Sequence, residues 1–213
     1  MLVAPPRRAS SPEGPTDSRS AAVVAEDGAL RLHSHNARTR AIAESFIQAI
    51  YRARYGADIR HWAPLLVSLG NGRSVTAAAG YRRASRPLFL ERYLDDTVDA
   101  LIAERTGAHI SRSAIFEVGH FAAVPGAGRM LMVALGRHLA ERGCTWVVCT
   151  ATRELRVLFA RTGVQAVELG PALAATLGAE AAAWGTYYDH APVVLAGALG
   201  PGVAALARQE PRA

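Results

Sequence analysis

One apolar segment of the chain carries the side chains best suited to acid–base chemistry. Residues Ser113–Val124 read SAIFEVGHFAAV, which is typical of a strand, and Glu117 lies inside it. Burial there would raise the pKa of Glu117 and suit a general base, although an outward-facing carboxylate is the alternative. Simple alternation puts His120 on the opposite face, but a bulge at Gly119 would bring both side chains to one face. Glu117 and His120 are therefore candidate catalytic residues.

The turn that follows this segment is a candidate anion-binding site. It reads Pro-Gly-Ala-Gly at residues 125–128 and precedes a predicted helix with Leu131, Leu135 and Leu139 in line. Glycines let a ligand approach the backbone, and a helix start presents unpaired N–H groups. A sterically tight turn is the alternative, and the dinucleotide fingerprint is missing because only two glycines are present. The candidate ligand-binding residues are Val124, Gly126, Ala127, Gly128 and Arg129.

A polar and aromatic cluster at residues 184–190 supplies a third candidate. Tyr188 could donate a proton to a leaving thiolate, and an ordinary packing role is the alternative. Cys144 and Cys149 are expected to be buried thiols rather than a disulfide, since five residues along one strand place them on opposite faces. No Cys-x-x-Cys is present and the seven His are scattered, so no metal site is expected.

The apolar periods predict elements that would position these groups. Strands are expected at 30–34, 65–69, 75–81, 113–124, 145–151, 166–169 and 193–199, and Asn71-Gly72 is typical of a hairpin turn. Helices are expected from Asn36 to Gly56, from Asp95 or Asp96 to Gly107, after the turn, at 152–162, and in an Ala-rich stretch at 171–183. The later strand–helix–strand units favour parallel pairing. We therefore expect an α/β fold with a single mixed sheet of about six to seven strands flanked by helices.

Composition bounds the organisation of the chain. Its 213 residues suit a single domain at 29–208, preceded by a Pro-, Ser- and Arg-rich extension at 1–28 expected to be disordered and followed by a short tail at 209–213. The net charge is +6, and all 24 basic residues are Arg, which excludes lysine-based chemistry. No signal peptide, transmembrane segment or nucleic-acid-binding motif is recognisable, so a cytoplasmic protein is expected.

Four segments, in order, resemble the thermostable hemolysin family of bacterial proteins. They are PLFLERYLD (87–95), IFEVGHFAAVPGAGRMLMVAL (115–135), RGCTWVVCTATRELRVLFARTGV (142–164) and AAAWGTYYDHAPVVLAG (181–197). The resemblance covers residues 36–207. The sequence departs from the family pattern at His120, where Asn is expected, and at Phe121, which replaces Leu.

This resemblance implies an acyl-CoA N-acyltransferase-like fold, similar to Gcn5-related N-acetyltransferases and acyl-homoserine-lactone synthases. In such folds the acyl thioester lies where the fourth and fifth strands splay apart, and the turn after the fourth strand holds the pantetheine pyrophosphate. Ala123 stands where the acetyltransferase motif has Gln or Arg, which leaves acyl carrier protein open as the donor beside CoA.

The expected activity is transfer of an acyl group from a CoA or acyl-carrier-protein thioester to an amine or hydroxyl. Acyl-CoA or acyl-phosphopantetheine would be a substrate, with no permanently bound cofactor. Two alternatives remain open. One is a membrane-active haemolytic protein, as the family name says, and the other is a non-catalytic acyl-thioester-binding module.

Overall fold

The computed structural model describes residues 29–71 and 74–208. The predicted extension at 1–28, the predicted tail at 209–213 and Gly72 of the predicted hairpin turn lie outside these residues. Seven strands form one sheet in the order β1-β2-β3-β4-β5-β7-β6, which confirms the predicted single mixed sheet. The strands are β1 (Arg31–His33), β2 (Leu65–Gly70), β3 (Val75–Arg83), β4 (Ile115–Ala123), β5 (Trp146–Ala151), β6 (Val167–Pro171) and β7 (Val193–Ala198).

Strand direction follows the prediction in the centre of the sheet and departs from it at one edge. β4 and β5 are parallel, as the helix between them requires. Parallel pairing of β6 with β5 was expected, and this was wrong, although the two strands run in the same direction. β7 inserts between β5 and β6 and is antiparallel to both of them. The last strand therefore separates two strands that are consecutive in the chain.

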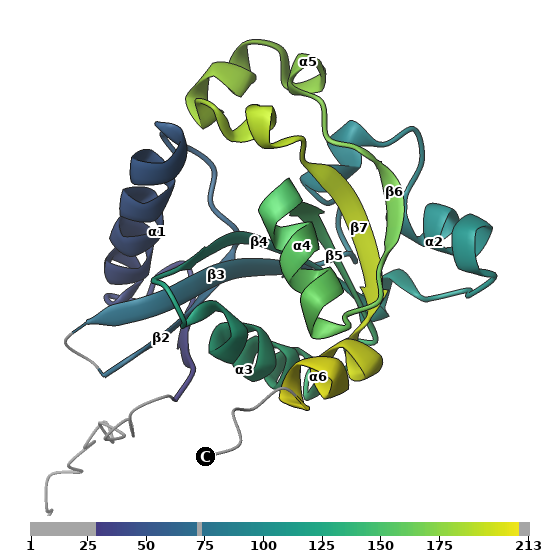
Figure 1. Ribbon diagram of the computed structural model, residues 1–213, viewed down its shortest axis with the longest axis horizontal. Coiled ribbons are helices and arrows are strands. Elements are labelled where there is room, and N and C mark those ends of the chain that lie inside the picture. Colours follow the sequence, from purple (N-terminus) through teal and green to yellow (C-terminus); the bar gives the residue numbers. More distant parts are fainter. Residues whose placement is uncertain (1–28, 72–73, 209–213) are drawn as a thin grey trace, which may run out of the picture.

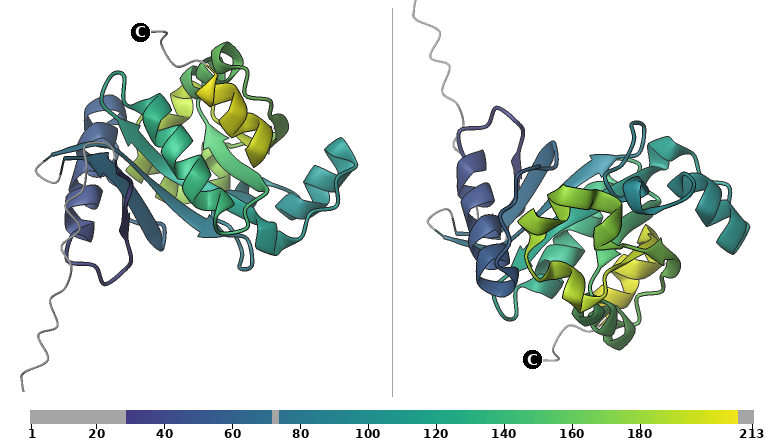
Figure 2. Two further views of the ribbon diagram at one scale, coloured as in Figure 1. Left: turned by 90° about the horizontal axis from the view of Figure 1, so that it is seen from below. Right: turned by 90° about the horizontal axis from the view of Figure 1, so that it is seen from above.

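Helices cover both faces of the sheet (Figures 1 and 2). α1 and α2 lie on one face, and α3, α4 and α6 lie on the other. The helices are α1 (Arg40–Tyr55), α2 (Val98–Thr106), α3 (Gly128–Ala140), α4 (Arg153–Thr162), α5 (Ala174–Leu177) and α6 (Leu199–Ala207). Short 3₁₀ helices link them: η1 (Leu90–Tyr93), η2 (Arg112–Ala114), η3 (Gly178–Trp184) and η4 (Tyr187–His190).

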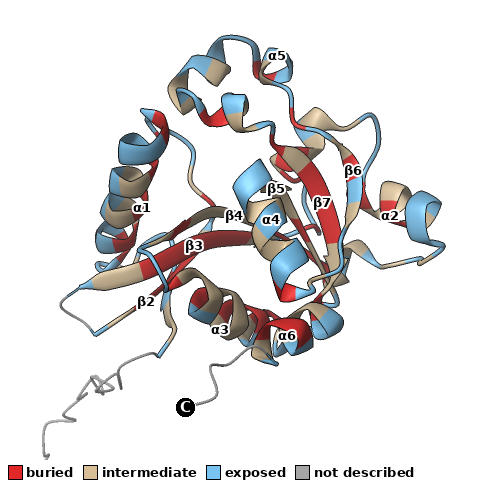
Figure 3. Ribbon diagram, viewed as in Figure 1, coloured by how far each residue is buried: buried red, intermediate tan, exposed pale blue. Residues whose placement is uncertain are grey.

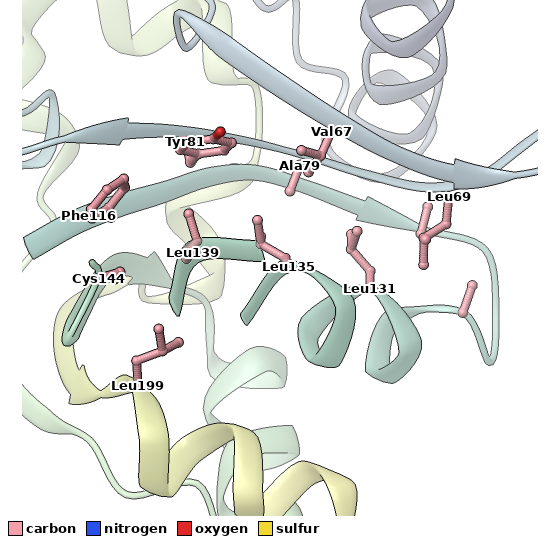
Figure 4. Packing of buried hydrophobic residues seen from close by; sticks show 12 residues of the cluster. Val67, Leu69, Ala79, Tyr81, Phe116, Leu131, Leu135, Leu139, Cys144 and Leu199 are labelled. Atoms are coloured by element: carbon pink, nitrogen blue, oxygen red, sulfur yellow. The ribbon is translucent and has the colours of Figure 1, made fainter. Parts of the chain in front are cut away.

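The core beneath α3 follows directly from its leucine spacing. Leu131, Leu135 and Leu139 are four residues apart, so they share one face of the helix and project toward the strands (Figure 4). All three are buried, against Tyr81 and Phe116 among others. Burying a leucine side chain contributes about 1.5–3 kcal/mol, so this row anchors the helix that begins at the predicted ligand turn.

Three local predictions need correction. α1 begins after Thr39 rather than at Asn36, although it ends at Gly56 as expected. The Ala-rich stretch at 171–183 is not one helix, because Gly178 adopts a φ of 56° between α5 and η3. The sequence pattern predicts no helix after the last strand, but Leu199–Ala207 form α6, which packs on α3 where Gly136 leaves room for Val203. Within the described residues, no helix has the length and apolar character needed to cross a membrane.

Candidate functional site

A cavity passes through the sheet where β4 and β5 separate. The two strands pair from Ile115 and Trp146 only as far as Val118 and Cys149, and β4 then continues to Ala123 without β5 beside it. The cavity has a volume of about 400 Å³ and is lined from both faces of the sheet. A cavity can cross a sheet only where two neighbouring strands are not hydrogen-bonded, because paired strands leave no space between their backbones. The splayed strands therefore create the site.

The two ends of the cavity differ in chemistry. On the α3 side the wall is mainly apolar and comes from three helices and β7, with Glu154 and Gln165 as polar members; its apolar residues include Leu135, Leu155, Leu158, Phe159, Leu195 and Val203. On the α1 side the wall carries polar and charged groups, with His61, Arg82, Glu117, His120 and Tyr187. The cavity thus suits a molecule with an apolar end and a reactive polar end.

Glu117 lies at the polar end and is almost fully buried, with 8% of its surface exposed. The backbone N–H groups of Phe89 and Leu90 donate to its two carboxylate oxygens over 3.0 and 3.2 Å. Arg82, its cross-strand neighbour on β3, lies 3.2 Å away through Nε. Burial raises the pKa of Glu117, and the Arg82 charge and the two N–H groups oppose that rise. The carboxylate is buried, oriented and paired.

A bulge places His120 on the same face of the sheet as Glu117. Gly80 pairs with Gly119, whereas Ala78 pairs with Ala122, so two residues of β4 oppose one residue of β3. His120 occupies this bulge with a φ of 52°, a left-handed conformation that Asn and His adopt more readily than most residues. The geometry matches the bulge considered from sequence, although the two side chains bond to different partners.

The imidazole of His120 is held in one orientation. Nε2 lies 3.0 Å from the carbonyl oxygen of His61, so Nε2 carries the proton and donates it. Nδ1 is enclosed and has no hydrogen-bond partner among the described residues. Burial lowers the pKa of His120 to about 4, so the ring is neutral at pH 7. Trp62 lies against it at a ring-centre distance of 5.3 Å.

The predicted ligand turn lies at the end of β4, beside the cavity rather than in its wall. Val124, Gly126, Ala127, Gly128 and Arg129 are not among the cavity-lining residues. The N–H of Ala127 donates to the carbonyl of Val124, and Arg129 donates to the carbonyl of Leu206. No side chain caps α3, so its first-turn N–H groups remain available to a ligand. The predicted binding role rests on these N–H groups rather than on Arg129.

The structure separates the tyrosines of the 184–190 cluster. Tyr188 does not line the cavity; its hydroxyl lies 2.7 Å from that of Tyr93, which does. Tyr187 also lines the cavity, and its hydroxyl donates to the Thr150 carbonyl over 3.4 Å. Burial raises the pKa of both Tyr93 and Tyr187. Tyr93 and Arg82 were not predicted from the sequence, because both are far from β4 in the chain and come close to it only in the folded protein.

The two cysteines are free thiols, and their predicted arrangement on one strand was wrong. Cys144 precedes β5 and is buried, whereas Cys149 lies on β5 and lines the cavity. Burial raises the pKa of each thiol to about 12, which makes both poor nucleophiles at neutral pH. Across residues 29–71 and 74–208, no group of three or more His, Cys, Asp and Glu side chains is placed to hold a metal ion.

The fold is that of acyl-homoserine-lactone synthases, as comparison with solved structures shows. The AHL synthase LasI superposes with a TM-score of 0.58 at 15% identity, over 83% of this chain and 93% of LasI. BjaI, a CoA-dependent acyl-homoserine lactone synthase solved with SAM and isopentyl-CoA, gives 0.53 at 16% identity over 85% and 88%. FeeM, an N-acyl amino acid synthase from uncultured soil microbes, gives 0.54 at 14% over 80% and 89%. At such identities the likeness establishes the fold.

The family assignment rests on the sequence itself. Residues 33–203 match the family model described as thermostable hemolysin, and the chain belongs to that family. This confirms the resemblance inferred from the four segments. Comparison with curated protein sequences found no match.

Proposed function

We propose that this protein is an acyltransferase, which moves an acyl group from a CoA or acyl-carrier-protein thioester to an amine or hydroxyl acceptor. The observation that carries the proposal is the cavity of about 400 Å³ through the β4–β5 splay, with buried Glu117 at its polar end. BjaI and FeeM, which share the fold, are named for acyl transfer to other molecules. The wall chemistry of the cavity supports the same class of reaction here.

The donor would lie in the splay with its acyl chain at the apolar end. Beyond Val118, the backbone of β4 has no strand beside it on the β5 side, which leaves N–H and C=O groups facing the cavity. The amide-rich pantetheine chain can pair with such an edge as an added strand does. Its phosphates would then reach the first turn of α3, next to Ala123 at the end of β4.

Glu117 would serve as the general base. Its Oε1 accepts one N–H bond, from Leu90, and keeps a lone pair for the proton of the acceptor. The acceptor nitrogen or oxygen bonds to the thioester carbon, and its proton passes to Glu117 directly or through water. The C–S bond then breaks, and the thiolate takes up a proton from Tyr93, which Tyr188 positions through their shared hydrogen bond. The proton on Glu117 then returns through solvent to Tyr93, so both side chains regain their starting states and no further reactant is needed.

The test is acceptor-dependent release of free thiol from acyl-CoA and from acyl carrier protein by the purified full chain. Glu117→Gln should lower turnover by about 10²–10⁴-fold while the thermal shift caused by acyl-CoA persists. Gln keeps an oxygen for the Leu90 N–H group but loses the acceptor for the Phe89 N–H group, so the persisting thermal shift is the check that the site remains folded. Turnover equal to that of the unmodified chain would remove Glu117 from the mechanism. Acyl-CoA binding with no turnover toward any acceptor would favour the binding-only alternative.

A further inference from the structure

A second hollow adjoins the polar end of the cavity and shares His61, Arg82 and Phe89 with it. Four arginines and two glutamates line this hollow: Arg40, Arg60, Arg82, Arg92, Glu44 and Glu180. Its formal charge is therefore positive. An acceptor that reaches Glu117 from this side meets a cationic surface first, which favours an anionic molecule.

Arg82 differs from the other arginines of the hollow because it combines unpaired terminal nitrogens with a partly buried position beside Glu117. Arg40 is held by Glu44 and two backbone carbonyls, and Arg92 forms a two-pronged pair with Glu180. Among the described residues Arg60 likewise pairs only through Nε, with Asp58, but 70% of its side chain is exposed at the surface. Arg82 uses Nε toward Glu117, and within the described residues its two terminal nitrogens have no hydrogen-bond partner. With 27% of its side chain exposed, Arg82 lines both this hollow and the main cavity, so these N–H donors are open to a ligand.

We propose that Arg82 binds the carboxylate of the acceptor and that the acceptor is an amino acid. The inference rests on the proposed acyltransferase function and names its second substrate class. Arginine matches a carboxylate with two parallel hydrogen bonds. Arg82 and Glu117 are directly paired across β3 and β4, so a carboxylate on Arg82 places an adjacent α-amino group beside the proposed base. The cross-strand pair thus selects and orients the same molecule.

A phosphate of the acyl donor fits Arg82 less well. The donor phosphates are proposed at the first turn of α3, which follows Ala123, whereas Arg82 is level with Glu117. Six residues of extended strand separate these two levels, which is roughly 20 Å. The same donor therefore cannot place one phosphate at both points. A carboxylate on the acceptor accounts for the open nitrogens of Arg82.

The experiment compares each amino acid with its amide, which keeps the amine and loses the negative charge. Thiol release from acyl-CoA is measured for both acceptors with the unmodified chain, Arg82→Gln and Arg60→Gln. Arg60→Gln removes the same charge from the rim of the hollow but leaves the pair with Glu117 intact. We expect the unmodified chain to prefer the acid at least tenfold in kcat/KM. Arg82→Gln should abolish that preference, mainly through KM, and Arg60→Gln should keep it.

The ratio of the kcat/KM values for an amino acid and its amide shows whether Arg82 recognises the carboxylate or only supports Glu117. If Arg82→Gln acts only by altering the pKa of Glu117, the rates with the amino acid and with its amide fall together. An unchanged ratio between them would overturn the inference. Equal use of acids and amides by the unmodified chain would overturn it while leaving the acyltransferase proposal intact.

If acyl-CoA is neither bound nor consumed, the proposed function fails by itself. Calorimetric titration with amino acids, their amides and inorganic phosphate then still measures whether Arg82 binds a carboxylate. Acid binding that is lost in Arg82→Gln supports the site. Phosphate binding as tight as acid binding, or no binding of acids, overturns it.

Discussion

The imidazole of His120 occupies the space into which a side chain at Gly80 would project. A Cβ at position 80 would lie 2.9 Å from His120 Nδ1 and 2.7 Å from the Ala63 Cβ. Gly80→Ala should therefore displace both the His120 ring and the backbone that carries Ala63, and lower the free energy of unfolding by about 1–3 kcal/mol. Urea denaturation measures that loss.

Gly119 provides the matched control, because it pairs with Gly80 across the same bulge and has nothing within 4 Å of its Cβ position. Gly119→Ala should leave the free energy of unfolding within about 1 kcal/mol of the original value. Equal losses for both variants would show that the bulge, rather than the His120 contact, needs glycine.

The buried ring of His120 predicts a specific loss of stability in mild acid. Its pKa falls from 6.5 to about 4 on folding because of burial, so the unfolded chain takes up the proton first. The stabilisation is present above pH 6.5 and is lost as the pH falls toward 4. His120→Asn, which restores the family residue and tolerates a positive φ, should remove on the order of 1–3 kcal/mol of the difference between pH 7 and pH 5.

Burial also lowers the pKa of His33, so His33 also makes the folded protein less stable as the pH falls. It does so equally in the unmodified chain and in His120→Asn. It therefore cancels when the variant is compared with the unmodified chain. An identical pH dependence for His120→Asn would mean that folding does not lower the pKa of His120.

Glu117 predicts the acid limb of the activity profile. Burial raises its pKa above the ordinary 4.5, and a general base works only when deprotonated. The kcat/KM value should therefore rise with pH through an apparent pKa above 4.5 and then level off. Profiles of the residual activity of Glu117→Gln should lack this limb. The same limb in that variant would assign it to another group.

The apolar end of the cavity predicts a limit on acyl-chain length. Leu158 on α4 lines this end, and Leu158→Trp would fill part of it. The variant should respond to short acyl-CoA as the unmodified chain does, with a smaller thermal shift for long chains. Val157 lies next to it on the exposed side of α4, at 44% exposure, so Val157→Trp is the control. A change at both positions would indicate a general effect on α4.

The tyrosine pair predicts unequal effects of two similar substitutions. Tyr93→Phe removes the hydroxyl that lines the cavity, whereas Tyr188→Phe removes only its partner. We expect a larger loss of kcat for Tyr93→Phe and a smaller one for Tyr188→Phe, with unchanged KM for acyl-CoA. Steady-state kinetics with a poor and a good thiol leaving group measure this, and the loss should be greater for the poor one. Equal small losses would exclude proton donation by the pair.

Local patterns were sufficient for the elements that carry the site. The alternation of β4, the leucine row of α3 and the glycine ends of α1 and α2 are all readable because each depends on near neighbours. The position of β7 was not readable, since its pairing with β5 and β6 depends on chain segments far apart. The Ala-rich stretch misled because helix propensity in 171–183 yields to the bend at Gly178.

The site itself was readable only in part. Glu117 could be identified from its own segment, but its N–H donors come from residues 27 and 28 positions away. Arg82 belongs to none of the segments that carry the sequence-based candidates. Arg82 lies beside Glu117 because the register of β3 and β4 pairs the two residues, and no short sequence motif encodes that register.

The apolar side of helix α4 faces the main cavity rather than packed side chains. Leu155, Leu158 and Phe159 line the cavity, and Thr162 is the one residue of the helix that is buried (Figure 3). Its N-terminal end is fastened by Glu154 to His190 and by Arg156 to the carbonyl of Ala191. An empty protein should therefore release its α4 amide protons to deuterium faster than those of α3, and a bound acyl chain should slow that exchange selectively.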